Sequence, residues 1–137
     1  MSALVRLKLA KCTDPKAAQR ALELLNKDCA AHMHSDSTME GYGYGGTKAD
    51  VLVRKMFFSG LCDLGFAKQN AAEMQCLYDS DDTRKINKAF GTQNFEQEFM
   101  QYYSAAVAET TLQSQGYGCS VERDVQGVVH VNATAYA

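Results

Sequence analysis

Two very short polar turns separate three apolar segments in the middle of this chain, and they limit its fold more than any other feature. The segments with strand patterns are Val51–Met56, Leu61–Lys68 and Ala72–Tyr78, and the turns between them fall at Ser59-Gly60 and Gln69-Asn70. Connections of this length join antiparallel neighbours, because a parallel pair of strands needs a crossover of a dozen or more residues. The middle of the chain therefore predicts an antiparallel sheet.

The N-terminal third predicts a strand, a helix and a long loop. Apolar residues alternate with other residues over 3–9, as in a strand with one buried face. Asp14-Pro15 is typical of a helix start, and the helical pattern continues to about Lys27. A second strand is possible near Cys29–His34, and the polar, glycine-rich segment Ser35–Thr47 has no apolar period, which indicates a loop.

The C-terminal third predicts two helices and a hairpin. A short helix ends at Gly91, and Asn94 with Gln97 resembles a capping box at the start of a longer helix. That longer helix is expected to end at Gly116 in the left-handed conformation. The last strands, 117–123 and 128–136, are predicted to pair as a hairpin.

This order of elements predicts an α+β fold: a mostly antiparallel sheet of five or six strands with two main helices packed on one face. The 137 residues, of which 46% are hydrophobic, fit a single α+β domain over residues 1–137, with a flexible glycine- and tyrosine-rich loop at about 35–47. In the longer helix Phe95, Phe99 and Tyr102 trace one apolar face, so Phe99 is expected in the core.

Charge and hydropathy limit the classes of partner. The formal net charge is −2 and the pI is near 5.9, with no basic run longer than Arg84-Lys85, so neither a nucleic acid nor an anionic membrane is the expected partner. No apolar run approaches the roughly 18 to 20 residues that span a bilayer, and the chain does not begin with a signal-peptide pattern. A cytoplasmic location is therefore expected.

The segment GYGYGG, from Gly41 to Gly46, matches the dinucleotide-binding pattern G-x-G-x-x-G. That pattern binds a pyrophosphate only when it follows a buried parallel strand and opens a helix. The sequence predicts neither a strand before this segment nor a helix after it. We therefore interpret the segment as a partner-contact loop in which the glycines permit unusual backbone angles and the two tyrosines offer contact area; its members are Tyr42, Gly43, Tyr44, Gly45 and Gly46. A small-ligand or nucleotide-binding domain that uses this loop is the alternative.

Two further clusters resemble reactive sites. The stretch from Asp79 to Thr83 matches the D-x-D-x-T motif of haloacid-dehalogenase-type phosphatases. The rest of the chain lacks the sheet that such enzymes need, so the aspartates are interpreted as helix caps.

Cys29, His32 and His34 are weak candidates for a metal site, because the sequence offers no fourth ligand. No metal, cofactor or catalytic residue is therefore predicted, and the five scattered cysteines are expected to be free thiols.

Three segments of the chain share their order with a known family. They are Ala49–Val53, Asp63–Phe66 and Phe95–Tyr103, followed by a helix to Gln115 and a strand after Gly127. In these respects the chain resembles the hypothetical chloroplast reading frame thirty-five family of small proteins from cyanobacteria, plastids, other bacteria and phages. The resemblance implies a small cytoplasmic α+β protein, in some bacteria encoded near an ATPase of the AAA type. Because the family has no established biochemical activity, the resemblance carries over no catalytic residue.

From these observations we expect a non-enzymatic protein-interaction or accessory module. The partner expected is a protein, either an AAA-type ATPase or a host protein, and a homo-oligomer is also possible. A phage accessory protein that binds and inhibits a host factor is the remaining alternative.

Overall fold

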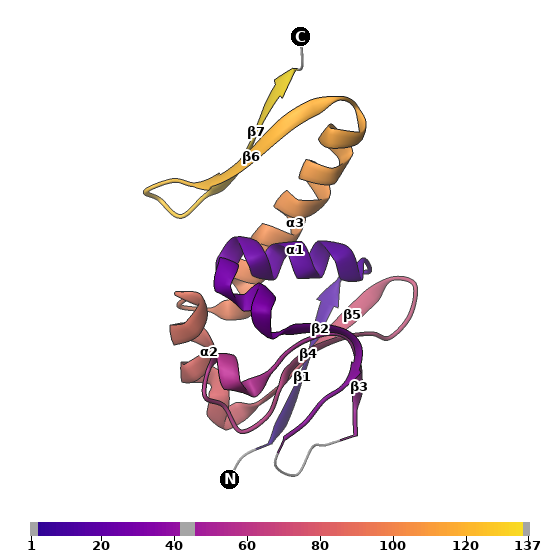
Figure 1. Cartoon of the computed structure of the whole chain (residues 1–137), viewed down its shortest axis with the longest axis vertical. Coiled ribbons are helices and arrows are strands. Elements are labelled where there is room, and N and C mark those ends of the chain that lie inside the picture. The colour runs from indigo at the N-terminus through magenta and orange to yellow at the C-terminus, as the bar shows by residue number, and fades with distance from the viewer. Residues whose placement is uncertain (1–2, 42–45, 136–137) are drawn as a thin grey trace.

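The computed structural model of this chain describes residues 3–41 and 46–135. It contains a body of sheet and helices, from which the C-terminal part projects (Figure 1). The strands are β1 (Leu4–Ala10), β2 (Met33–Thr38), β3 (Lys48–Val53), β4 (Leu64–Lys68), β5 (Glu73–Asp79), β6 (Tyr117–Arg123) and β7 (Val129–Ala135). The helices are α1 (Pro15–Leu25), α2 (Thr83–Phe90) and α3 (Phe95–Ser114), with short 3-10 helices at Lys27–His32, Lys55–Phe57 and Ser80–Asp82.

The body is built on a five-stranded sheet in the order β1-β5-β4-β3-β2, in which all neighbours are antiparallel. The first strand of the chain therefore pairs with β5, and β1 and β2 form the two edges. β6 and β7 make a separate two-stranded sheet. The α+β class and the antiparallel sheet of five strands predicted from the sequence are thus confirmed.

The helix ends follow the capping signals of the sequence. The Asp14 carboxylate accepts a hydrogen bond from the Lys16 N–H, with Pro15 in the first turn of α1. At the start of α3 the Asn94 side chain accepts from the Gln97 N–H at 3.2 Å. Gly116, just beyond α3, has φ of 92°, which is the left-handed conformation expected there.

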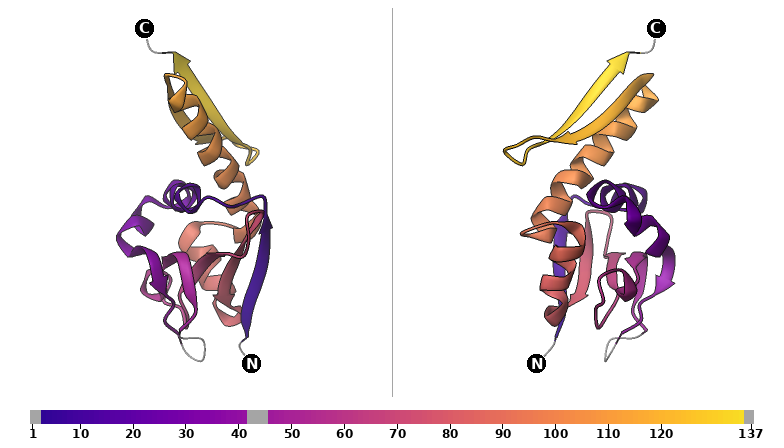
Figure 2. Two further views of the ribbon diagram at one scale, coloured as in Figure 1. Left: turned by 90° about the vertical axis from the view of Figure 1, so that its right-hand side faces the viewer. Right: turned by 60° about the vertical axis from the view of Figure 1, so that its left-hand side comes forward.

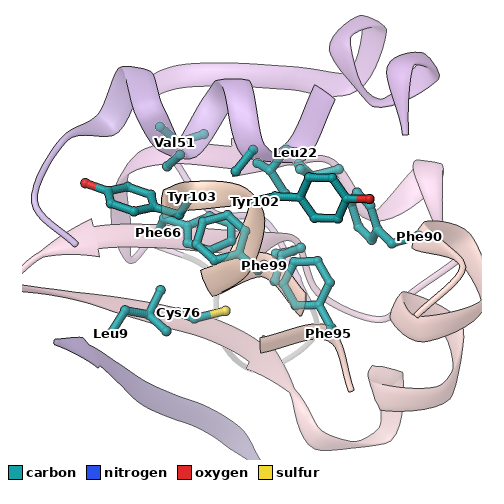
Figure 3. Close-up of a cluster of buried hydrophobic side chains, with 14 of the residues drawn as sticks. Leu9, Leu22, Val51, Phe66, Cys76, Phe90, Phe95, Phe99, Tyr102 and Tyr103 are labelled. Atoms are coloured by element: carbon teal, nitrogen blue, oxygen red, sulfur yellow. The ribbon is translucent and has the colours of Figure 1, made fainter. Parts of the chain in front are cut away.

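One face of the sheet carries the main core. The helices α1, α2 and α3 all bury apolar side chains against the inward residues of β1, β3, β4 and β5. Figure 3 shows the aromatic centre of this core, where the rings of Phe66 on β4 and Phe99 on α3 stack with centroids 4.7 Å apart. The Tyr103 hydroxyl accepts hydrogen bonds from the N–H groups of Thr13 and Asp14, which ties α3 to the start of α1. Both predicted helices therefore pack on the same face, and Phe99 is fully buried as expected.

The opposite face of the sheet has a smaller apolar cluster, made of Leu4, Met39, Ala49, Leu52, Cys62, Ala67 and Leu77. Met39 follows β2 and folds over Gly65 on β4. A Cβ atom at Gly65 would lie 2.5 Å from the Met39 sulfur, so a larger residue there requires the Met39 side chain to move. The segment after β2 therefore covers part of this face.

Four element predictions are wrong in detail. The strand predicted over Leu61–Lys68 begins only at Leu64. The second strand predicted near Cys29–His34 begins only at Met33, because the Asn26 side chain accepts from the Asp28 N–H and starts a 3-10 helix that runs to His32. Ser35–Thr47 is not entirely a loop, since residues 35–38 belong to β2. That strand is an exposed, polar edge strand, so it has no apolar alternation to reveal it. The strand that contains Val51 ends at Val53 and does not reach Met56.

The C-terminal hairpin lies along α3 and projects from the body (Figure 2). We call residues 107–135, which comprise the end of α3 with β6 and β7, the arm. None of the helices in the described part of the chain is long and apolar enough to cross a membrane.

Candidate functional site

The glycine-rich segment joins two antiparallel strands. Of its residues, Tyr42, Gly43, Tyr44 and Gly45 lie outside the described part of the chain. Gly41 forms a bridge with Cys62, and the Gly46 N–H donates to the Met39 carbonyl at 3.2 Å. A strand does precede the segment, contrary to expectation, but it is the exposed edge strand β2. Because β3 follows instead of a helix, the context of a pyrophosphate site is missing.

Gly41 has a packing role in this segment. A Cβ atom on Gly41 would lie 2.6 Å from the Cys62 Cα atom, closer than real contacts allow. Glycine therefore permits the backbone of the segment to approach the turn before β4. This requirement accounts for the first glycine of the pattern without any phosphate.

The aspartates of the D-x-D-x-T motif have structural partners. The Asp79 carboxylate accepts from the Asp81 N–H at 2.8 Å and caps the 3-10 helix. The sequence predicts that these aspartates cap a helix, but the Asp82 side chain does not cap α2. Its fully buried carboxylate accepts instead from the N–H groups of Leu61 and Cys62 at 2.9 to 3.1 Å.

A second buried carboxylate, that of Asp63, organises the neighbouring turn. Asp63 accepts from the Arg54 guanidinium and from the N–H groups of Glu40 and Lys55, each at 2.8 Å. These donors come from two separate segments, Arg54-Lys55 just after β3 and Glu40 after β2, and no local spacing in the sequence reveals that they meet. Asp63 and Asp82 together hold the backbone between β3 and β4. One oxygen of the nearby Asp79 is buried and has no hydrogen-bond partner in the described part of the chain.

The structure does not bring the three metal candidates into one site. Cys29 is buried beneath α1, the His32 ring packs on Phe57 with centroids 5.3 Å apart, and His34 is exposed on β2. Across residues 3–41 and 46–135 no group of three or more potential ligands lies close enough to hold a metal ion. The absence of bound zinc stays a prediction.

The cysteines are free, and four of the five are buried. Burial raises the pKa of the Cys12 and Cys62 thiols to about 11 and that of the Cys29 thiol to about 12. Burial also raises the pKa of Cys76 well above its ordinary value. These four side chains are therefore protonated at neutral pH, where a thiol is a poor nucleophile.

The arm is the region where apolar groups remain uncovered. In the hairpin, residues such as Val121 and its partner Val131 face α3, while Ser120 and Asn132 face the opposite side. The face toward α3 is only partly buried. Of the six large apolar side chains that the described residues expose, four lie in the arm, namely Val107, Tyr117, Val125 and Val128.

Two ion pairs position the arm. Arg20 on α1 forms a bidentate ion pair with Glu109 on α3, with N–O distances of 2.8 and 3.0 Å. The Glu109 side chain is nearly buried. Arg123 at the end of β6 contacts Glu98 at 2.8 Å and holds the hairpin tip near the start of α3.

An open cleft of about 520 Å³ lies between the hairpin tip and α3. It is lined mainly by the amide side chains of Gln93, Asn94, Gln97, Gln101 and Gln126.

Comparison of the chain with protein-family models, with curated proteins and with solved structures finds no match. The family resemblance of the sequence therefore stays a prediction.

Proposed function

We propose that this protein is a non-enzymatic interaction module that binds another protein through its arm. The observation that carries the proposal is the concentration of exposed apolar side chains there: Val107, 43% exposed, lies on α3, and Tyr117, 36% exposed, begins the hairpin. Exposed apolar side chains gathered in one region are characteristic of protein contact surfaces.

The construction of the arm supports this proposal. A two-stranded hairpin alone is marginally stable in water, and here its apolar face is covered by one helix only. The Arg20–Glu109 and Arg123–Glu98 pairs nevertheless hold the helix and hairpin in place. A surface that is positioned but incompletely covered favours binding, because little order is lost when a partner covers it. The partner class predicted from the sequence is an AAA-type ATPase or a host protein.

Site-directed photo-cross-linking tests the arm directly. A photoreactive amino acid at Val107 should give a discrete cross-linked protein in cells of the source organism. The same residue at Asn132, on the polar face of the hairpin, is the matched control and should give none. Mass spectrometry of the adduct then tells whether the partner is an ATPase, another protein or a second copy of this chain.

A substitution at Val107 provides a second test. Val107→Arg should leave the free energy of unfolding within about 0.5 kcal/mol of the parent value, because the side chain is exposed. The same change should abolish the cross-link from a photoreactive residue placed at Tyr117. Equal cross-linking from Val107 and Asn132, or an adduct at Tyr117 that persists in the Val107→Arg protein, contradicts the proposal.

A further inference from the structure

The first strand leaves one row of backbone hydrogen-bonding groups open. Among the residues that the structure describes, 3–41 and 46–135, β1 pairs with β5 alone and forms an edge of the five-stranded sheet. The Ser80 N–H donates to the Ala3 carbonyl at 2.8 Å, and the Lys11 N–H donates to the Ala72 carbonyl at 3.0 Å. Bonded positions in an antiparallel ladder recur at every second residue, so Leu4, Arg6 and Lys8 direct their N–H and C=O groups away from β5.

The edge formed by β1 is regular, whereas the edge formed by β2 is not. β1 has seven residues, no proline and an unbroken register from Leu4 opposite Asp79 to Ala10 opposite Glu73. In β2 the register omits Asp36, whose φ is +46°. Distortion of this kind protects an edge from further pairing. By this measure β2 is protected and β1 is open to a further strand.

A groove runs beside the open edge. It measures about 410 Å³ and lies between β1 and the first half of α3, lined by Leu7, Lys8, Leu9, Asn94, Glu96, Gln97 and Met100. Leu7, Leu9 and Met100 provide apolar contact, and the side chains of Asn94 and Gln97 provide hydrogen-bonding groups. A strand added to β1 would direct every second side chain into this groove.

The remaining side chains of an added strand would meet two cations. Arg6 and Lys8 are exposed, and their neighbours on β5 are the uncharged Leu77 and Gln75. Within residues 3–41 and 46–135 neither cation has an ion-pair partner within 4.0 Å. Residues two apart on a strand lie on one face, so acidic residues at alternate positions of a neighbouring strand would face both cations.

The same two cations disfavour a second copy of this chain as the occupant. In the central antiparallel registers of β1 against itself, Arg6 lies opposite Arg6 or Lys8 of the other copy. Like charges directly opposite each other destabilise a strand pair. The edge of β1 is therefore better suited to a strand from a different protein than to β1 of a second copy of this chain.

We propose that β1 and the first half of α3 form a docking groove for an extended segment of another protein, in which acidic residues alternate with apolar residues. The segment adds to the sheet as a sixth strand beside β1, with its acidic side chains facing Arg6 and Lys8 and its apolar side chains in the groove. The groove shares Asn94 and Gln97 with the cleft under the hairpin tip but contains no residue of the arm, and the proposal does not depend on what the arm binds.

Binding of synthetic peptides to the full chain tests the proposal. A fluorescent eight-residue peptide that alternates valine with glutamate should bind, as measured by fluorescence anisotropy. The matched peptide that alternates valine with lysine should bind at least about tenfold more weakly. In the Arg6→Glu, Lys8→Glu double variant this preference should reverse.

A backbone substitution separates strand addition from simple charge attraction. Lys8→Pro removes an N–H group that points away from β5, so the β1–β5 ladder and the melting temperature should be retained. Peptide binding should be lost in Lys8→Pro and retained, though weakened, in Lys8→Ala. Amide chemical-shift changes on peptide binding should map to Leu4, Arg6 and Lys8.

Three results would overturn the proposal: no binding of the glutamate peptide, equal binding of both peptides, or shift changes confined to residues outside the groove. If Lys8→Pro does not fold, the shift map and the charge reversal decide the outcome without it. Because no arm residue is altered, failure of these experiments is distinguishable from failure of the proposed function.

Discussion

At the scale of single residues, the Asp63 carboxylate organises the turns between β3 and β4. Its side chain has no contact with solvent, and it accepts hydrogen bonds from two backbone N–H groups and from Arg54. Asp82 has the same role toward Leu61 and Cys62. Buried carboxylates of this kind are stable only while all their donors are in place.

Replacement of Asp63 is therefore expected to destabilise the protein. Asp63→Ala leaves the Arg54 guanidinium and two N–H groups without their acceptor, and the expected loss in the free energy of unfolding is about 3 to 5 kcal/mol. Asp81→Ala, at an exposed aspartate nearby, is the control and should cost less than about 1 kcal/mol. Urea denaturation measures both, and equal midpoints for the two variants would show that Asp63 has no such role.

Gly41 gives a second prediction at this scale. Gly41→Ala brings a methyl group within 2.6 Å of the Cys62 Cα atom, so the backbone bridge has to shift. We expect a loss of about 1 to 3 kcal/mol by thermal unfolding, as in other overpacked sites. Lys48→Ala, on the exposed side of β3, should change stability by no more than about 0.5 kcal/mol. If Gly41→Ala matches this control, the bridge is not required by the fold.

At the scale of elements, the hairpin turn is held by Asp124. One of its carboxylate oxygens accepts from the N–H groups of Gln126 and Val128 at 2.9 Å, and the other contacts His130 at 2.8 Å. The hydrogen bond to His130, followed by those from the backbone, lowers the Asp124 pKa below its ordinary value of 3.8. This turn ends β6 and starts β7 in the correct register.

The pH dependence of the turn follows from the direction of that shift. A lowered pKa in the folded state means that the contribution of Asp124 is present above pH 3.8 and is lost as the pH falls through the lower folded value. NMR titration should therefore place the Asp124 carboxyl below 3.8 in the native protein and nearer 3.8 in His130→Ala. Titration of the native carboxyl at or above 3.8 would contradict the arrangement.

At the scale of the whole molecule, stability depends on the main core between the sheet and the three helices. Phe99 lies at its centre, fully buried and in contact with the rings of Phe66, Phe95 and Tyr103. Phe99→Ala should reduce the free energy of unfolding by about 3 to 5 kcal/mol, since it removes a large buried side chain. Val125→Ala, at a fully exposed position, is the control. An unchanged denaturation midpoint for Phe99→Ala would place that residue outside the core.

Thiol labelling reports on both sides of the sheet, through Cys12, Cys29 and Cys76 in the main core and Cys62 in the cluster on the opposite face. A disulfide reagent should modify the partly exposed Cys119 rapidly in the native protein. Cys12, Cys29, Cys62 and Cys76 should react only as the protein unfolds, because they are buried and protonated. Cys119→Ser should remove the rapid phase. More than one rapidly reacting thiol in the native protein would contradict this packing.

Much of the secondary structure was predictable because its signals are local. The alternation in β1, the caps at Asp14 and Asn94 and the left-handed Gly116 act over a few residues, and each is found in the structure. β2 was misplaced because an exposed edge strand needs no apolar alternation. The partners of the buried aspartates were less predictable, because Asp82 accepts from the N–H groups of Leu61 and Cys62, which are distant in the sequence. Of the predicted contact loop, Tyr42 to Gly45 lie outside the described residues.

The sequence by itself determined the α+β class, the antiparallel sheet and the helices on one face, since periodicity and short turns are properties of neighbouring residues. Only the tertiary structure decided which strands form the edges, which aspartates are buried and which apolar side chains stay exposed. These properties depend on contacts between distant parts of the chain, such as Arg6 opposite Leu77 and Arg20 with Glu109. The open edge of β1 and the arm are therefore consequences of packing, and no local pattern in the sequence specifies either of them.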